Sequence, residues 1–139
     1  MPLALIATFE PTTGETRLFG QGLHQHAVER LPRDGFNPVA VFVRNDNDEI
    51  LGSVSGYLNW NWLQISLLWV DASLRGQSFG RQLMEKLEVT GEEKGCAWAH
   101  VDTFSFQARR FYEALGYKVF ATLDDFPPGH ARHYLKKRL

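Results

Sequence analysis

Apolar residues along this chain alternate between short continuous runs and stretches with helical spacing. Residues 63–70 are apolar with few breaks, whereas Phe79, Leu83 and Leu87 recur at four-residue intervals, so the pattern changes from extended to helical between them. A strand, a tight turn and a helix are therefore predicted in direct succession. The helix is expected to run over roughly residues 79–94 and to end at Gly95.

The same reasoning predicts the other elements. Strands are expected at residues 3–9, 39–43, 50–58, 97–103, 117–122 and 130–137. A helix is expected from Ser105, as its N-cap, to Leu115, with Gly116 as its stop. Rough helical spacing over residues 18–31 predicts an earlier helix that Pro32 would end.

The order of these elements favours an α/β fold. Polar turns at residues 45–48 and 59–61 would join the early strands into an antiparallel meander, and the strand-helix-strand unit around residues 79–94 predicts one parallel pair. We expect a single domain over residues 1–139, with a mixed, mostly antiparallel sheet flanked by helices. No internal repeat or linker divides it.

Composition limits the partners. With 139 residues, a hydrophobic fraction of 44% and a formal charge of −1, the chain is large enough for one core and gives no reason to expect nucleic acid. Cys96 is the single cysteine, which favours a reducing compartment. Residues 3–7 are too short an apolar run for a signal peptide, and no stretch has the length of a membrane span, so a cytoplasmic protein is expected.

The turn before the central helix has the chemistry of an anion site. It is the run Arg75-Gly76-Gln77-Ser78-Phe79-Gly80-Arg81. A helix N-terminus presents unpaired N–H groups, and glycines allow a close approach to phosphate oxygens. The run lacks the Gly-Lys-Ser/Thr of a P-loop and the spacing of a dinucleotide fingerprint.

The turn resembles motif A of the GCN5-related N-acetyltransferases (GNAT), Gln/Arg-x-x-Gly-x-Gly/Ala, which binds the pyrophosphate of acetyl-coenzyme A. Ser78 stands where that family usually has its middle glycine, and a serine is tolerated there if its dihedrals are helical. The later segment from Ser105 to Tyr117 resembles the family pattern Asn-x-x-Ala-x-x-Phe-Tyr-x-x-x-Gly-Phe, with Ser105 in place of asparagine.

The resemblance implies roles for particular residues. The pyrophosphate would be bound by Arg75, Gly76, Gln77, Ser78, Phe79, Gly80 and Arg81. The backbone of Leu68, Trp69 and Val70 would pair with the pantetheine arm, and Thr103 and Ser105 would contact its other side. Tyr112 would protonate the leaving thiolate, although its place on an apolar helix stripe is also typical of a core tyrosine.

The general base is left open. Asp71, Asp102, His100, His130 and His133 are all candidates, and water would also serve. No metal is expected, because the histidine pairs lack ligands at zinc spacing and direct acyl transfer needs none.

These observations predict an N-acetyltransferase that moves acetyl from acetyl-coenzyme A to a primary amine by direct attack. The acceptor is a small molecule or a protein amine, selected by the region before Pro32, the Trp60 turn and the loop at residues 124–129. The alternatives are a non-catalytic acyl-coenzyme A binding module and an unrelated nucleotide site. The sequence leaves open whether the chain is a monomer or a homodimer.

Overall fold

The computed structural model describes residues 3–31 and 37–139 of the chain. It divides into two compact units, residues 1–35 and 36–139, which are described separately. Among the described residues, no helix is both long and apolar enough to cross a membrane.

The described residues of the first unit form one helix, α1 (Thr13–Val28). Thr12 begins it with a capping box, in which its hydroxyl accepts from Glu15 N and the Glu15 side chain accepts from Thr12 N. The helix therefore starts five residues before residues 18–31, for which helical spacing predicted it. The strand predicted at residues 3–9 is wrong: those residues are irregular, because the described part of this unit holds no second strand to pair with. The predicted stop at Pro32 lies outside the described residues.

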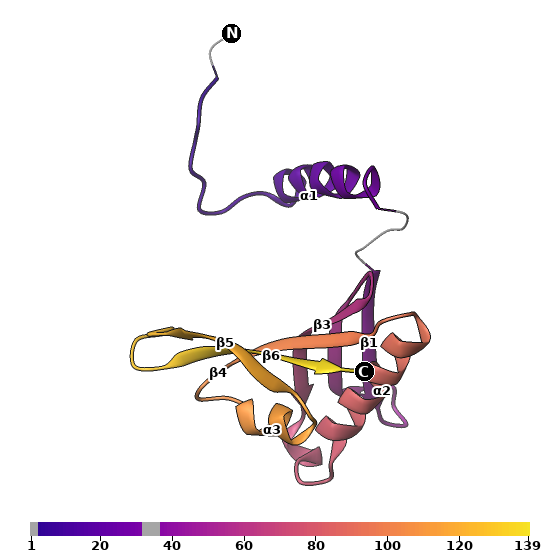
Figure 1. The fold of residues 1–139 in the computed structure, drawn as a ribbon. Helices are drawn as coiled ribbons and strands as arrows, with labels where there is room; N and C mark the ends of the chain where they lie inside the picture. The colour runs from indigo at the N-terminus through magenta and orange to yellow at the C-terminus, as the bar shows by residue number, and fades with distance from the viewer. Residues whose placement is uncertain (1–2, 32–36) are drawn as a thin grey trace. The chain divides into compact units, whose positions relative to one another are not determined.

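The second unit is built on a six-stranded mixed sheet with the order β1-β2-β3-β4-β6-β5 (Figure 1). Its strands are β1 (Asn37–Arg44), β2 (Ile50–Asn59), β3 (Trp62–Val70), β4 (Trp98–Phe104), β5 (Lys118–Asp124) and β6 (Ala131–Arg138). Only β3 and β4 pair in parallel; the other neighbours are antiparallel. The predicted meander and the parallel pair are confirmed.

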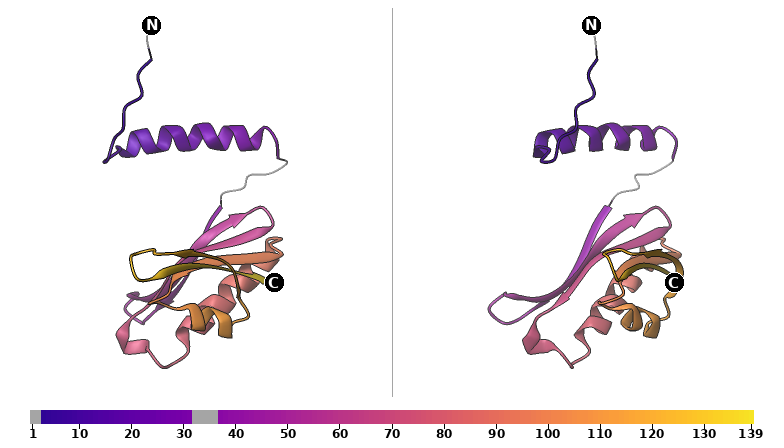
Figure 2. Two further views of the ribbon diagram at one scale, coloured as in Figure 1. Left: turned by 60° about the vertical axis from the view of Figure 1, so that its left-hand side comes forward. Right: turned by 90° about the vertical axis from the view of Figure 1, so that its left-hand side faces the viewer.

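Both helices of this unit cover the same face of the sheet, as Figures 1 and 2 agree. A short 3₁₀ helix, η1 (Ala72–Leu74), precedes α2 (Phe79–Glu93), and α3 (Arg109–Ala114) follows β4. The apolar stripe of α2 buries Leu83, Met84 and Leu87 against the sheet, where Leu63 and Val54 are fully buried. This packing holds the N-terminus of α2 at the edge where β3 ends.

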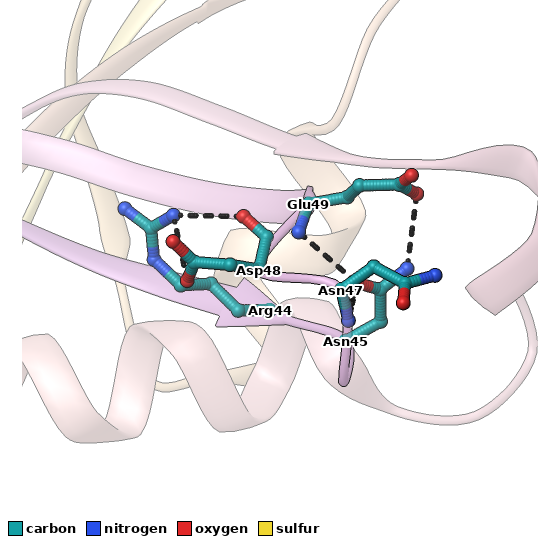
Figure 3. A network of polar contacts seen from close by, with 5 residues as sticks. All are labelled: Arg44, Asn45, Asn47, Asp48 and Glu49. Carbon is teal, nitrogen blue, oxygen red and sulfur yellow. Dashed lines mark hydrogen bonds and ion pairs between the residues drawn. The ribbon is translucent and has the colours of Figure 1, made fainter.

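The β1–β2 hairpin closes through its predicted polar turn (Figure 3). Asn45 Oδ1 accepts from Asn47 N at 2.9 Å and from Glu49 N at 3.0 Å, which satisfies amides that the tight turn leaves unpaired. Arg44 Nη1 donates to the Asp48 carbonyl at 3.1 Å. The hairpin is thus stabilised by local polar contacts, at the end of the sheet where β3 leads into α2, since Gly52 pairs with Val70 and Asp71 N donates to the Leu51 carbonyl at 2.8 Å.

Candidate active site

The parallel strands β3 and β4 separate after a short pairing. Residues Trp62 to Gln64 of β3 pair with Trp98 to His100 of β4. Beyond Gln64, the backbone of β3 on the side of β4 makes no strand pairing with it. A bulge between β2 and β3 falls at the same place, opposite Gly56. Gly56 is needed here, since a Cβ on it would lie 1.9 Å from the Gln64 carbonyl oxygen. The sheet is therefore opened between β3 and β4, at the carboxyl ends of both strands.

The turn after β3 has a backbone suited to an anion. Gly76 has φ of 78° and Ser78 has φ of 64°, both in the left-handed region. Ser78 does not have the right-handed helical dihedrals that would make a serine easily tolerated: the residue takes the left-handed conformation that favours glycine, because the chain must reverse there to enter α2. Ser78 forms no side-chain cap. The first amides of α2 therefore remain available as donors, at the positive end of the helix dipole.

This turn lines a pocket of about 340 Å³. Its lining residues are Val70, Leu74, Arg75, Gly76, Ser78, Phe79, Gly80, Arg81 and Phe111. Arg75 and Arg81 line the same pocket, and Arg81 Nη1 makes a long contact to Glu85 Oε1 at 3.5 Å. The pocket thus combines backbone donors with fixed positive charge, which fits a pyrophosphate.

Gln77 and Trp69, which the resemblance assigns to the phosphate and pantetheine sites, do not line this pocket or the second pocket described below. The Gln77 side chain donates back to the Ser73 carbonyl at 3.3 Å. Trp69 is 49% exposed and is absent from the pocket lining, whereas its neighbours Leu68 and Val70 each line a pocket. Any contribution of Gln77 and Trp69 to binding is therefore expected from their backbone.

A second pocket, of about 350 Å³, lies where β3 and β4 diverge. It is lined by Ser66, Leu67, Leu68, Asp102, Thr103, Phe104, Gln107, Ala108 and Tyr112. Thr103 and Tyr112 belong to the buried side of the sheet, whereas Asp102 and Phe104 project to the opposite side. The opening therefore joins the helix-covered face of the sheet to the other face.

Tyr112 is buried at 6% exposure yet lines this second pocket. Its ring packs edge-on against Phe111 and Tyr117. Within residues 37–139, no group hydrogen-bonds its hydroxyl. Burial, with a smaller effect of the Asp102 carboxylate, raises the pKa of Tyr112, so the phenol stays protonated and able to donate.

The loop before α3 is organised differently from the prediction. The helix begins at Arg109, with Ala108 as its N-cap, so the prediction of Ser105 as N-cap is wrong. The Ser105 hydroxyl instead accepts from Ala131 N at 3.0 Å and ties the loop to β6. Thr103 Oγ1 accepts from Ala108 N at 3.2 Å. Thr103 lines the pocket, and Ser105 does not.

The candidate bases differ in their surroundings. Asp71 caps η1 through Ser73, and the Ser73 hydroxyl and amide lower the pKa of Asp71. His133 is buried and bonds Thr122 Oγ1 at 2.9 Å. His130 packs on Phe106, and burial lowers the pKa of His100. Of these five candidates, Asp102 alone lines the pocket that contains Tyr112.

Trp62 lies at the paired end of β3 and not at the opening. Its ring stacks on Trp98 with centroids 5.4 Å apart. Trp62 therefore covers a face of the sheet at a distance from the opened end. The opening is instead bordered by Phe104, which sequence patterns did not single out.

Arg132 was also missed from the sequence. Its Nε donates to Asp102 Oδ2 at 2.8 Å, and its Nη2 donates to the same oxygen. The two residues are thirty positions apart in sequence and meet because β4 and β6 pair antiparallel. Only the strand register places them together, so no local sequence signal could have found the pair.

Comparison with known proteins gives the same family as the motifs. Residues 10–117 match the model of the Acetyltransferase (GNAT) family. A blasticidin-S acetyltransferase of Streptomyces morookaense is 38% identical over 117 residues, which are 81% of this chain and 86% of that protein.

Solved structures agree. An acetyltransferase of Bacillus cereus superposes with a TM-score of 0.79 at 33% identity, covering 96% of this chain and 98% of the other. A putative acetyltransferase of Agrobacterium tumefaciens superposes with a TM-score of 0.91 at 23% identity, covering 99% of this chain and 100% of the other, and shows the shared fold. The predicted GNAT fold is therefore confirmed. The chain belongs to the GNAT family of acetyl-coenzyme A-dependent acetyltransferases.

Proposed function

We propose that this protein transfers the acetyl group of acetyl-coenzyme A directly to the primary amine of a small molecule. The observation that carries the proposal is the pair of adjoining pockets along the opened strands, one with phosphate chemistry and one containing Tyr112. Val70 lines the first pocket and Leu68 the second, so alternate positions of β3 lead from the pyrophosphate turn to the reacting end.

In this mechanism the amine nitrogen attacks the thioester carbonyl carbon, and the carbon–sulfur bond then breaks. The Tyr112 hydroxyl protonates or hydrogen-bonds the departing thiolate, for which its raised pKa keeps a proton available. Backbone groups of β3 near Leu68 polarise the carbonyl, because fixed donors need no reorganisation as charge develops. The proton lost by the amine passes to Asp102 or to water beside it.

The remaining cofactor roles are proposed on the same basis. Arg75, Gly76, Ser78, Phe79, Gly80 and Arg81 bind the pyrophosphate, with backbone donation from Gln77. Thr103 contacts the pantetheine arm. Ser105 is a weaker candidate, since its hydroxyl is engaged by Ala131 N.

We also propose that residues 1–139 act as a single acetyltransferase domain. The family match runs from residue 10 to residue 117 and so crosses the boundary between the two units.

The test is release of coenzyme A thiol from acetyl-coenzyme A with a panel of amines, beginning with blasticidin S because of the 38% identical relative. Amine-dependent thiol release, with an acetylated product seen by mass spectrometry, is the expected result. Binding of coenzyme A without turnover on any acceptor would favour the non-catalytic module. Thermal stabilisation by ATP or NAD, but not by coenzyme A, would favour the unrelated nucleotide site.

A further inference from the structure

Partly exposed aromatic rings gather beside the pocket that contains Tyr112. Phe104 lines this pocket, and its ring stacks on Phe106 with centroids 5.4 Å apart and planes at 4°. The Phe126 ring, from the β5–β6 loop, lies 5.5 Å from Phe104. Phe106 is 55% exposed and Phe126 is 39% exposed. We call Phe104, Phe106 and Phe126 the aromatic shelf.

A carboxylate stands next to the shelf. Asp102 and Phe104 are alternate residues of β4, so their side chains leave the same face of the sheet. Arg132 Nε and Nη2 both donate to Asp102 Oδ2, and within residues 37–139 no hydrogen bond engages Oδ1. The Arg132 guanidinium also lies over the Phe104 and Phe126 rings, at 5.3 and 5.2 Å from their centroids. Arg132 therefore holds the carboxylate and the shelf in one arrangement.

We propose that the aromatic shelf and Asp102 Oδ1 form the acceptor site, and that it selects primary amines carrying a flat unsaturated ring. This inference rests on the proposed acetyl transfer. The ammonium of the acceptor is attracted by the free carboxylate oxygen at the mouth of the pocket, and its ring stacks against Phe106 and Phe126. A saturated ring of the same size gains burial there but little of the stacking that two aromatic faces provide.

The matched acceptors are 2-phenylethylamine and 2-cyclohexylethylamine, which differ only in the unsaturation of the ring. Wild-type protein is expected to show a kcat/KM about twofold to twelvefold higher for the phenyl compound, the range that one aromatic pair supplies. The double variant Phe106→Leu/Phe126→Leu should remove this preference. Phe120→Leu is the control, since Phe120 is 54% exposed on β5 and its ring lies near Lys136 instead.

Equal kcat/KM values for the two amines in wild-type protein would contradict the proposal that the aromatic shelf selects the acceptor. A preference that persists in the double variant would contradict it as well. Asp102→Asn is expected to lower kcat/KM for both amines about tenfold or more, since a neutral amide attracts the ammonium less than a carboxylate. An unchanged value in Asp102→Asn would remove Asp102 from the site. Stabilisation by coenzyme A in a melting experiment verifies that each variant is folded.

Calorimetric titration of both amines into coenzyme A-bound protein separates this inference from the proposed function. If no amine releases coenzyme A, the proposed acetyl transfer is contradicted. The titration still tests whether the aromatic shelf binds the aromatic amine. Tighter binding of 2-phenylethylamine that is lost in Phe106→Leu/Phe126→Leu supports the shelf. Equal binding of the two amines, or binding of neither, overturns it.

Discussion

Gly76 and Ser78 both adopt left-handed backbone conformations in the turn that begins α2, with φ of 78° and 64°. The two residues differ in how readily they do so. An L-residue with a Cβ loses roughly 1–2 kcal/mol in this region, whereas glycine does not. Of the two residues, Ser78 alone is therefore strained, and the packing of α2 offsets this strain.

Replacing these residues should have opposite effects on stability. Ser78→Gly is expected to raise the free energy of unfolding by up to about 1 kcal/mol, because relief of the strain exceeds the added entropy of the unfolded chain. Gly76→Ala should lower it by about 1–2 kcal/mol, although no atom lies within 4 Å of the added Cβ. Urea denaturation measures both. Destabilisation by Ser78→Gly would show that its hydroxyl or Cβ supports the turn.

The sequence predicted the central part of this fold well because each signal there is local. The change of period between residues 70 and 79 and the glycines at 95 and 116 need no knowledge of tertiary contacts, and the structure confirms them. The capping box of α1 is equally local, since Thr12 and Glu15 are three positions apart, yet the helix was predicted only from residue 18.

The predictions were wrong where contacts between residues far apart in sequence determine the local structure. A strand at residues 3–9 requires a partner that apolar composition cannot supply. Ser105 has the chemistry of an N-cap, but the antiparallel register of β4 and β6 places Ala131 N beside its hydroxyl. The hydroxyl therefore accepts from Ala131 N and does not cap α3. The pairing of Asp102 with Arg132 depends on the same register. Sequence therefore predicted the phosphate turn more fully than the acceptor side of the site.

His100 should make stability depend on pH in mildly acidic solution. Burial lowers the pKa of His100, and the Asp102 carboxylate opposes this effect only in part. As pH falls through the ordinary histidine pKa of about 6.5, the unfolded chain binds a proton that the folded state resists, so stability is lost. His100→Gln should reduce the fall in urea midpoint between pH 7.5 and pH 5, relative to wild type. An identical pH dependence in both proteins would contradict this assignment.

An ion pair between α2 and β6 should be sensitive to removal of its cation. Lys137 Nζ lies 2.6 Å from Glu88 Oε2, with side chains 27% and 7% exposed. Lys137→Met leaves the nearly buried carboxylate without its partner and should cost about 3 kcal/mol, the lower part of the range for buried pairs. The double variant Glu88→Leu/Lys137→Met should recover most of that loss in chemical denaturation. A double variant no more stable than the single one would show that Lys137 acts through packing.

Tyr112→Phe should separate catalysis from binding. It removes the hydroxyl of a tyrosine that lines the second pocket and retains the ring that packs on Phe111 and Tyr117. We expect kcat to fall roughly 100-fold, the lower part of the range for general acid catalysis, with little change in coenzyme A affinity. Steady-state thiol release and calorimetry with coenzyme A measure the two quantities.

The control for this substitution is Tyr117→Phe. Tyr117 is another buried tyrosine, its ring centroid lies 6.0 Å from that of Tyr112, and it does not line the pocket. Its loss of a hydroxyl changes the same region of the core without removing a proton donor from the reacting end. Full activity in Tyr117→Phe together with low kcat in Tyr112→Phe therefore assigns the effect to the Tyr112 hydroxyl. Equal losses in the two variants would instead assign it to packing beneath the opened strands, and Tyr112 would then be a core residue.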